Sequence, residues 1–182
     1  YAVMSLLHGP LSDALGRRVV VLAGVLLFSA ASVWCALAGS IGELLAARAL
    51  QGVSTGAGLI VGRAIVRDLY HGPEAQKVMA LITLFFGVAP ALAPVFGGLV
   101  YQAADWRAVF WFLALYGLAL FALCWRSLPE THPRAARMPL VFGPLARVYG
   151  VQARDLRFVL LAVATGFNFG ASFLYISSAP AF

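Results

Sequence analysis

Long uncharged apolar runs alternate with short polar segments along the chain. Uncharged stretches cover residues 19–42, 78–104, 108–125 and 158–182, and a further apolar run near 41–66 is interrupted by two arginines. A helix that rises 1.5 Å per residue needs about 20 residues to cross a hydrocarbon core of roughly 30 Å. Each of these runs therefore predicts a membrane-spanning helix.

The polar segments set the boundaries of the predicted elements. We expect the end of one helix at 1–8, a loop at 9–18, and then helices at 19–38, 42–66, 75–100, 107–127 and 156–178. These elements divide the chain into an N-terminal bundle (1–127), a linker (128–154) and the first helix of a second bundle (155–182). The linker is rich in proline and arginine, so it either follows the inner leaflet with its arginines toward lipid headgroups or forms a disordered tether.

Composition fixes the class of protein. Hydrophobic residues make up 62% of the 182 residues and charged residues only 11%, which leaves too little polar surface for a soluble domain. The chain is therefore predicted to be an all-α integral membrane protein. It begins and ends inside apolar segments, and we expect it to be a fragment of a longer polytopic protein.

The basic residues are distributed unequally between the two sides of the predicted bundle. If the loops alternate between two sides, one side carries Arg17, Arg18, Arg63, Arg67, Lys77, Arg126, Arg134, Arg137, Arg147, Arg154 and Arg157. Only Arg48 and Arg107 remain for the other side. Because cytoplasmic loops carry an excess of lysine and arginine, loop 9–18 and linker 128–154 are predicted to be cytoplasmic.

The same distribution argues against nucleic acid as a partner, since these arginines flank helices and reach lipid phosphate. An enzyme is also disfavoured. The three histidines, His8, His71 and His132, lie at predicted loops or helix ends, and no paired carboxylates, CxxC or HExxH occur. We expect no catalytic residues and no metal site.

Loop 9–18, with the sequence GPLSDALGRR, combines turn formers, one carboxylate and two adjacent guanidinium groups. Gly9 and Gly16 allow tight turning, and Asp13 is suited to accept from backbone N–H groups or to pair with an arginine. Such a loop can hold a cytoplasmic face shut. The alternative is an ordinary turn whose arginines only set topology.

Arg48 lies roughly 9 Å inside its predicted helix, where a charge is costly unless it is functional or reaches the surface. Gln51 and Gly52 follow one turn later, and the spacings Gly52-x-x-x-Gly56 and Gly58-x-x-x-Gly62 predict close helix packing. The alternative is that Arg48 extends to the outer surface.

Two prolines interrupt the predicted helix at 75–100, in the stretch Gly87-Val-Ala-Pro90-Ala-Leu-Ala-Pro94-Val-Phe-Gly97-Gly98. The prolines remove backbone hydrogen bonds and the glycines permit close approach of a neighbour, which predicts a hinge at membrane depth. In the last helix, Asn168 and Tyr175 are seven residues apart and share a face, so they line a cavity or bond a neighbouring helix.

These stretches resemble motifs of the major facilitator superfamily. GPLSDALGRR resembles the signature G-x-L-S-D-R-x-G-R-R between helices 2 and 3 of that family, with matches at Gly9, Leu11, Ser12, Asp13, Gly16, Arg17 and Arg18. Ala14 stands where an arginine is usual. The charge pairing of that arginine is therefore missing or rebuilt, and Arg63 and Arg67 are the candidates.

Two further stretches carry the resemblance. Arg48-Ala-Leu-Gln51-Gly52 resembles the helix-4 motif R-x-x-Q-G, whose arginine is associated with proton coupling in the family. The stretch from Gly87 to Gly98 resembles the helix-5 antiporter motif in the form found in the bicyclomycin-resistance (Bcr/CflA) branch, with Ala93 in place of a glycine. The sequence Leu-Pro-Glu-Thr at 128–131 and residues 166–180 fit that branch too.

The resemblance implies a partial bundle, about six helices of an expected twelve, running from late helix 2 to helix 7. It implies export of small amphipathic drug-like molecules across a bacterial inner membrane by proton antiport with alternating access. No cofactor is expected besides the coupling protons, whose carboxylate carrier is expected in helix 1, and the lipid bilayer surrounds a monomer. The alternatives are a symporter or uniporter for a sugar or metabolite, and a membrane protein that does not transport.

Overall fold

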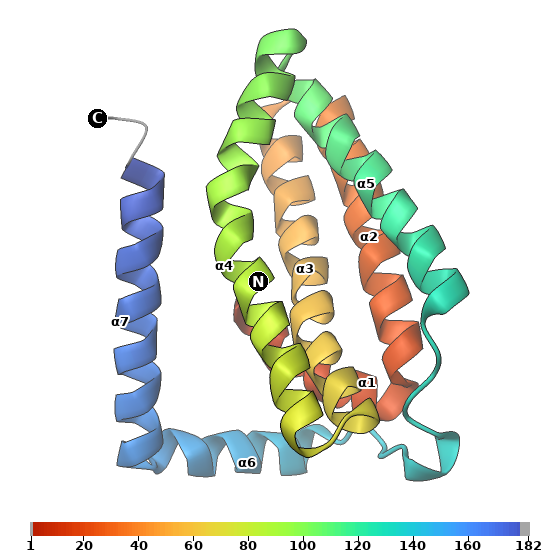
Figure 1. The fold of residues 1–182 in the computed structure, drawn as a ribbon, viewed down its shortest axis with the longest axis vertical. Coiled ribbons are helices and arrows are strands. Elements are labelled where there is room, and N and C mark those ends of the chain that lie inside the picture. Colours follow the sequence, from red (N-terminus) through yellow and green to blue (C-terminus); the bar gives the residue numbers. More distant parts are fainter. Residues whose placement is uncertain (1, 179–182) are drawn as a thin grey trace. The chain divides into compact units, whose positions relative to one another are not determined.

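Apolar helices joined by tight turns make up most of residues 2–178, the part of the chain that the computed structural model describes (Figure 1). The elements are α1 (Ala2–Leu15), α2 (Arg17–Leu37), α3 (Ile41–Leu69), α4 (Gly72–Ala103), α5 (Trp106–Ser127), the short 3-10 helix η1 (Arg134–Ala136), α6 (Phe142–Arg154) and α7 (Leu156–Ser178). These residues contain no strand. Helices α2, α3, α4 and α5 are each long and apolar enough to cross a membrane.

The chain forms two compact units, residues 1–139 and residues from 140 onward. The segment expected as a single linker is divided between them. Residues 128–139 belong to the first unit with α1 to α5, whereas α6 forms the second unit with α7. Residues 142–154, for which a disordered tether was one alternative, are helical.

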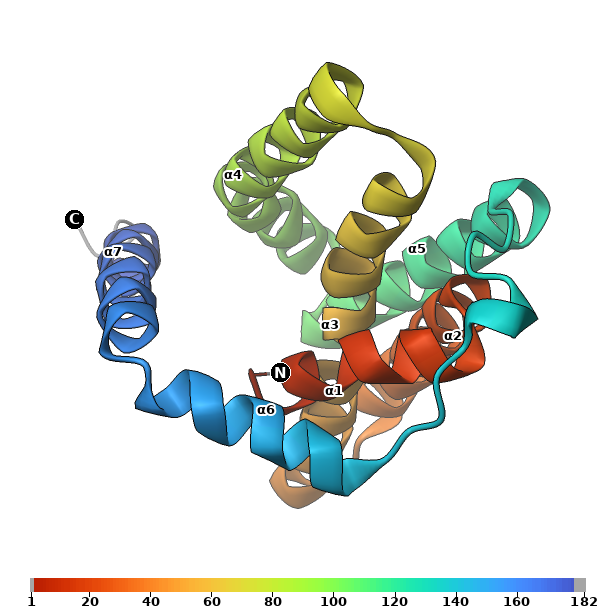
Figure 2. The same ribbon diagram turned by 90° about the horizontal axis from the view of Figure 1, so that it is seen from below.

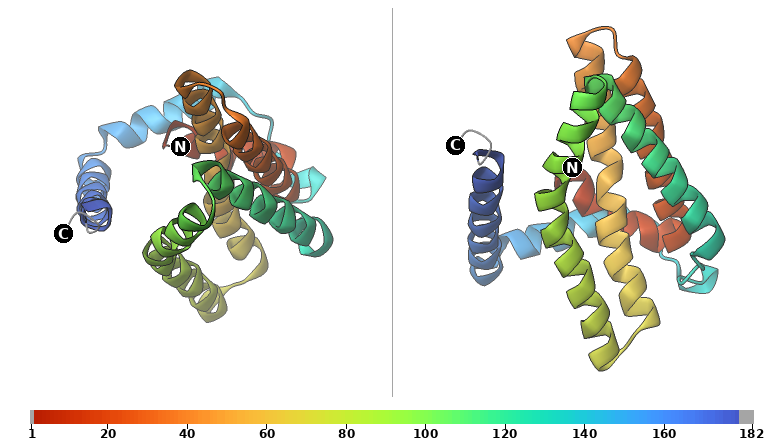
Figure 3. Two further views of the ribbon diagram at one scale, coloured as in Figure 1. Left: turned by 90° about the horizontal axis from the view of Figure 1, so that it is seen from above. Right: turned by 45° about the horizontal axis from the view of Figure 1, so that its top comes forward.

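Two side-chain helix caps mark one end of the first unit. The side chains of Ser40 and Asp105 accept hydrogen bonds from the backbone N–H groups of Glu43 (3.2 Å) and Ala108 (3.0 Å), and so begin α3 and α5. Both caps lie at one end of the bundle. The α1–α2 junction, the α3–α4 turn and residues 128–139 lie at the opposite end (Figures 1 and 3).

Helix α2 is central to the packing of the first unit because it contacts both α3 and α5 (Figure 2). A buried apolar cluster joins Val20 and Val21 of α2 to Ala57, Val61 and Ile65 of α3. Small residues let the helices approach closely, as expected for membrane bundles: a Cβ added to Gly24 would lie 2.8 Å from the Cβ of Ala57. Helix α4 contributes no buried residue.

The structure corrects the expected loop at 9–18. Helix α1 continues to Leu15, so residues 9–15 are helical and Pro10 lies inside the helix. Proline removes one backbone hydrogen bond and bends a helix, but the following turn is held by the bond from the Gly16 N–H to the Ser12 carbonyl (3.1 Å). The chain turns from α1 into α2 at Gly16, with φ 104°.

Candidate functional site

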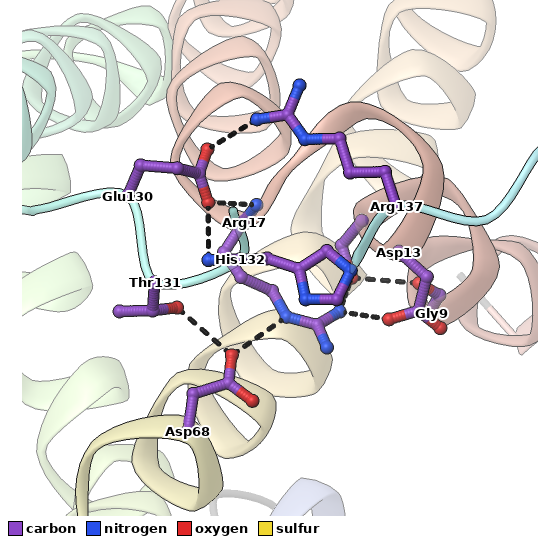
Figure 4. A network of polar contacts seen from close by, with 9 residues as sticks. Gly9, Asp13, Arg17, Asp68, Glu130, Thr131, His132 and Arg137 are labelled. Atoms are coloured by element: carbon purple, nitrogen blue, oxygen red, sulfur yellow. Dashed lines mark hydrogen bonds and ion pairs between the residues drawn. The ribbon is translucent and has the colours of Figure 1, made fainter. Parts of the chain in front are cut away.

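The Arg17 side chain is the centre of a polar cluster at the α1–α2 junction, and the whole residue is only 8% exposed. Its guanidinium donates to Asp13 and to the hydroxyl of Ser12 in α1, and its Nε donates to Oδ2 of Asp68 near the end of α3 at 3.2 Å (Figure 4). A buried cation is tolerated when carboxylates and hydrogen bonds compensate it. Arg17 thereby ties the ends of α1, α2 and α3 together.

These contacts show which arginine pairs with the carboxylates at this junction, where Ala14 stands in place of the usual arginine. Arg63 and Arg67, the expected replacements for the arginine that is usual at position 14, are exposed and form no ion pair within the described part of the chain. Arg17 instead forms the ion pairs, one with Asp13 and one with Asp68. Arg18 turns away from the cluster: it donates to the Trp125 carbonyl at 2.6 Å and lies 5.5 Å from the centroid of the indole ring.

Glu130 caps the start of α2. Its Oε1 accepts from the backbone N–H of Arg17 at 2.9 Å and from that of His132 at 3.0 Å, and its Oε2 accepts from Arg137 at 3.4 Å. A carboxylate at a helix N-terminus is stabilised by unpaired N–H groups and by the helix dipole. A Cβ at position 16 would displace the Glu130 carboxylate and the Arg137 guanidinium, and the φ of 104° there favours glycine.

Two further bonds hold the segment that follows α5 against this junction. The Thr131 hydroxyl donates to Oδ2 of Asp68 at 3.0 Å, and the backbone N–H of Met138 donates to the Asp13 carbonyl at 3.3 Å. The first part of the expected linker therefore belongs to the site around Arg17 (Figure 4).

A second polar cluster lies inside the bundle around Gln51, which is 3% exposed. Its Oε1 accepts from Arg48 at 2.9 Å, and its Nε2 donates to the Ser32 hydroxyl of α2 at 2.7 Å. Ser32 in turn donates to the Phe28 carbonyl at 2.8 Å. The Gln51 amide and the Ser32 hydroxyl therefore both have hydrogen-bond partners, which buried polar groups need in a low-dielectric interior.

The Arg48 guanidinium is held from two sides, since it also lies 5.9 Å from the ring centroid of Phe110 in α5. Arg48 itself remains exposed. It stands seven residues into α3, a depth of about 10 Å at the rise of an α-helix. Gly52 follows Gln51 and is half-buried.

The predicted residues of α4 and α7 are not among those that form these two clusters. Pro90 and Pro94 lie inside α4 as expected, but a Cβ added to Gly87, Gly97 or Gly98 would meet nothing within 4 Å in the described residues. Asn168 is exposed on α7, in the second unit, and the side chain of Tyr175 lies outside the described residues.

Sequence reasoning missed Ser32 and Asp68, and it used Glu130 only as part of a motif. Asp68 did carry a signal, because a carboxylate in the last turn of a helix opposes the helix dipole and is expected to have a nearby cation. Ser32 carried no such signal in the sequence, because it is one of several serines in an apolar run. Only the packing of α2 on α3 places it opposite Gln51.

Comparison with known proteins extends these observations. The family model described as Major Facilitator Superfamily matches residues 1–182. An MFS-type transporter, YdgK, of Bacillus subtilis is 40% identical over 96% of this chain and 44% of its own length. A bicyclomycin resistance protein homolog of Haemophilus influenzae is 32% identical over 95% of this chain and 44% of its own. A chloramphenicol resistance protein of Pseudomonas aeruginosa is 37% identical over 96% of this chain and 41% of its own.

A solved structure agrees with the sequence relatives. The human organic anion transporter MFSD10 (TETRAN) superposes with a TM-score of 0.67 at 30% identity, over 78% of this chain and 33% of its own. The chain thus spans less than half the length of the relatives that it matches. Four apolar spanning helices, a fold shared with a solved transporter and a family match over the whole chain lead to one conclusion: this chain is part of a multi-pass membrane protein and belongs to the Major Facilitator Superfamily.

Proposed function

We propose that the complete protein exports small amphipathic drug-like molecules across the bacterial inner membrane in exchange for protons, as a secondary active transporter with alternating access. Three relatives support the substrate class by their names: a bicyclomycin resistance protein homolog, a chloramphenicol resistance protein, and the Escherichia coli multidrug resistance protein D, which is 37% identical over 73% of this chain. The end of the bundle that carries the Arg17 cluster is the cytoplasmic end in this proposal.

The observation that carries the proposal is the fixed, exposed guanidinium of Arg48 in a membrane-spanning helix. A charge at this depth is costly and marks ion or substrate pathways in membrane proteins. Gln51 and Phe110 orient the guanidinium without neutralising it, because neither side chain is charged. Arg48 therefore retains its electrostatic effect on any carboxylate that binds or releases a proton nearby.

The Arg17 cluster supports a second part of the proposal. It joins three helix ends and the segment after α5 into one polar block at the proposed cytoplasmic face. Asp13 keeps 46% of its side-chain surface exposed although it pairs with Arg17, so this carboxylate has capacity for a further partner. We assign the block the role of a gate that closes on the cytoplasmic side.

Transport into everted membrane vesicles tests the proposal. Vesicles that contain the complete protein should accumulate radiolabelled chloramphenicol when their interior is acidic, and the accumulation should collapse when a protonophore dissipates the pH gradient. Chloramphenicol is one probe of a drug panel that should include cationic dyes. No gradient-dependent movement across the panel would contradict drug export and favour a metabolite carrier on the same fold.

The role of Arg48 is tested in the same vesicles. Arg48→Ala should abolish gradient-driven accumulation, and Arg48→Lys should retain part of it because the positive charge survives. Arg63→Ala is the matched control, since Arg63 is an exposed arginine of the same helix that forms no ion pair within the described residues. Full activity of Arg48→Ala would contradict the assignment.

A further inference from the structure

Helix α6 has two chemically distinct faces. Arg147 and Arg154 are seven residues apart, which at 3.6 residues per turn places them on one face, and both are exposed. Val148 and Tyr149 follow Leu145 by three and four residues on the opposite face, which also carries Gln152; Leu145 and Tyr149 are half-buried. Val148 is 52% exposed, so part of this apolar face has no cover within the described residues.

The junction with α7 sets the direction of α6. The Asp155 N–H donates to the Gln152 carbonyl at 3.2 Å to end α6, and the Asp155 carboxylate accepts from the Arg157 N–H at 2.9 Å to begin α7. Within this second unit, α6 runs crosswise to α7 (Figure 1). Because α7 is an apolar helix that we expect to cross the membrane, a helix crosswise to it lies along the membrane surface.

The exposed charges of this unit are mostly positive and therefore suit an anionic surface. Arg147, Arg154 and Arg157 are exposed and form no ion pair among the described residues, while the single carboxylate nearby, Asp155, is used as a cap. A helix is about 10 Å across and an interfacial helix sinks roughly 5–10 Å into the headgroup boundary. With the apolar face in the acyl boundary, the arginine face then stands at the level of the lipid phosphates.

We propose that α6 is a docking surface for anionic phospholipid: its apolar face inserts between lipid headgroups, and Arg147 and Arg154 bind their phosphates. Two arginines near an anionic surface are worth about a thirtyfold preference over a neutral surface. The docked helix fixes the entry of α7 at the membrane surface. This proposal concerns the bilayer and does not depend on which substrate the protein carries.

Hydrogen–deuterium exchange of the complete protein in nanodiscs tests the proposal. One set of nanodiscs contains phosphatidylcholine alone, and the other contains phosphatidylcholine with phosphatidylglycerol. The backbone amides of 145–153 should exchange about tenfold more slowly, or slower still, in the anionic nanodiscs. Amides in α2 serve as the internal reference, because they lie in a bonded membrane helix in both sets.

The variants separate lipid binding from other causes of protection. The double variant Arg147→Gln with Arg154→Gln should lose the difference between the two lipid compositions. Arg134→Gln should keep it, because Arg134 is an exposed arginine of the first unit. Equal exchange in both nanodiscs would overturn the proposal, as would a difference that survives the double variant. Slow exchange in both compositions would mean that protein covers α6, not lipid.

Discussion

Gly16 is the only residue between α1 and α2, and two independent requirements meet at this position. Its φ of 104° and ψ of 149° place it in a backbone region that side chains rarely adopt. Its missing side chain also leaves the space that the Glu130 carboxylate occupies. The backbone conformation of residue 16 and the close approach of Glu130 are therefore both favoured by the absence of a Cβ at this position.

We expect Gly16→Ala to lower the free energy of unfolding by about 1–3 kcal/mol from backbone strain alone, with a further loss as Glu130 is displaced from the start of α2. Unfolding of the purified protein in mixed micelles by SDS, followed by circular dichroism, measures the difference. Gly9→Ala is the control: a Cβ there meets nothing within 4 Å and the residue is helical, so its stability should be unchanged or slightly higher. Equal stability of the two variants would contradict both the backbone strain expected at position 16 and the stabilisation of α2 by Glu130.

The two polar clusters show how far single residues can be predicted from the sequence. Arg48 and Gln51 were named together as parts of one motif, and the structure joins them at 2.9 Å because they lie three apart on one helix. Partners from other helices were not identified. Ser32 and Glu130 are separated from Gln51 and Arg17 by 19 and 113 positions, and such contacts depend on how helices pack rather than on local spacing.

Among the elements, α4 differs from its neighbours in having two interior prolines and no buried residue. Pro90 and Pro94 lack the N–H groups that would bond to the carbonyls four residues earlier, so the middle of this helix is held less firmly than its ends. A weakly packed helix with a weakened centre is suited to bending.

Replacing Pro90 and Pro94 together with alanine should restore these backbone bonds and stiffen α4. In the vesicle assay we expect the rate of drug accumulation to fall at least several-fold while the protein remains at least as stable, because a hinge and not a contact is removed. Pro73→Ala is the control, since Pro73 is in the first turn of α4, where no helical bond is lost. Unchanged transport by the double variant would show that bending of α4 is not used.

Helix positions were predictable because apolar runs bounded by charges are a strong signal in membrane proteins. The all-α membrane class is confirmed, and α2 and α5 lie within two residues of the predicted 19–38 and 107–127. Residues 9–15 were predicted wrongly as a loop. Glycine, proline and aspartate close together are typical of turns, but here the bond from Gly16 to Ser12 extends the helix through all three.

For the whole molecule, the grouping of basic residues at one end of the first unit predicts its orientation. Reporter fusions in a bacterium test this. Alkaline phosphatase fused after Gly39 or Asp105 should be active, because both turns are predicted to be periplasmic, and green fluorescent protein fused after His71 or Pro133 should fluoresce in the cytoplasm. The reverse pattern would place the Arg17 cluster on the periplasmic side and overturn its role as a cytoplasmic gate.

The contacts of Glu130, Thr131 and Met138 with α1, α2 and α3 have a consequence for biosynthesis. All of these contacts lie within residues 1–139, so the first unit itself supplies the partners described above for the Arg17 cluster. Domains generally fold as units during synthesis, and at about 5–20 residues per second the ribosome needs several seconds to add residues 140–182. We therefore expect the segment after α5 to fasten the first unit before synthesis of residues 140–182 is finished.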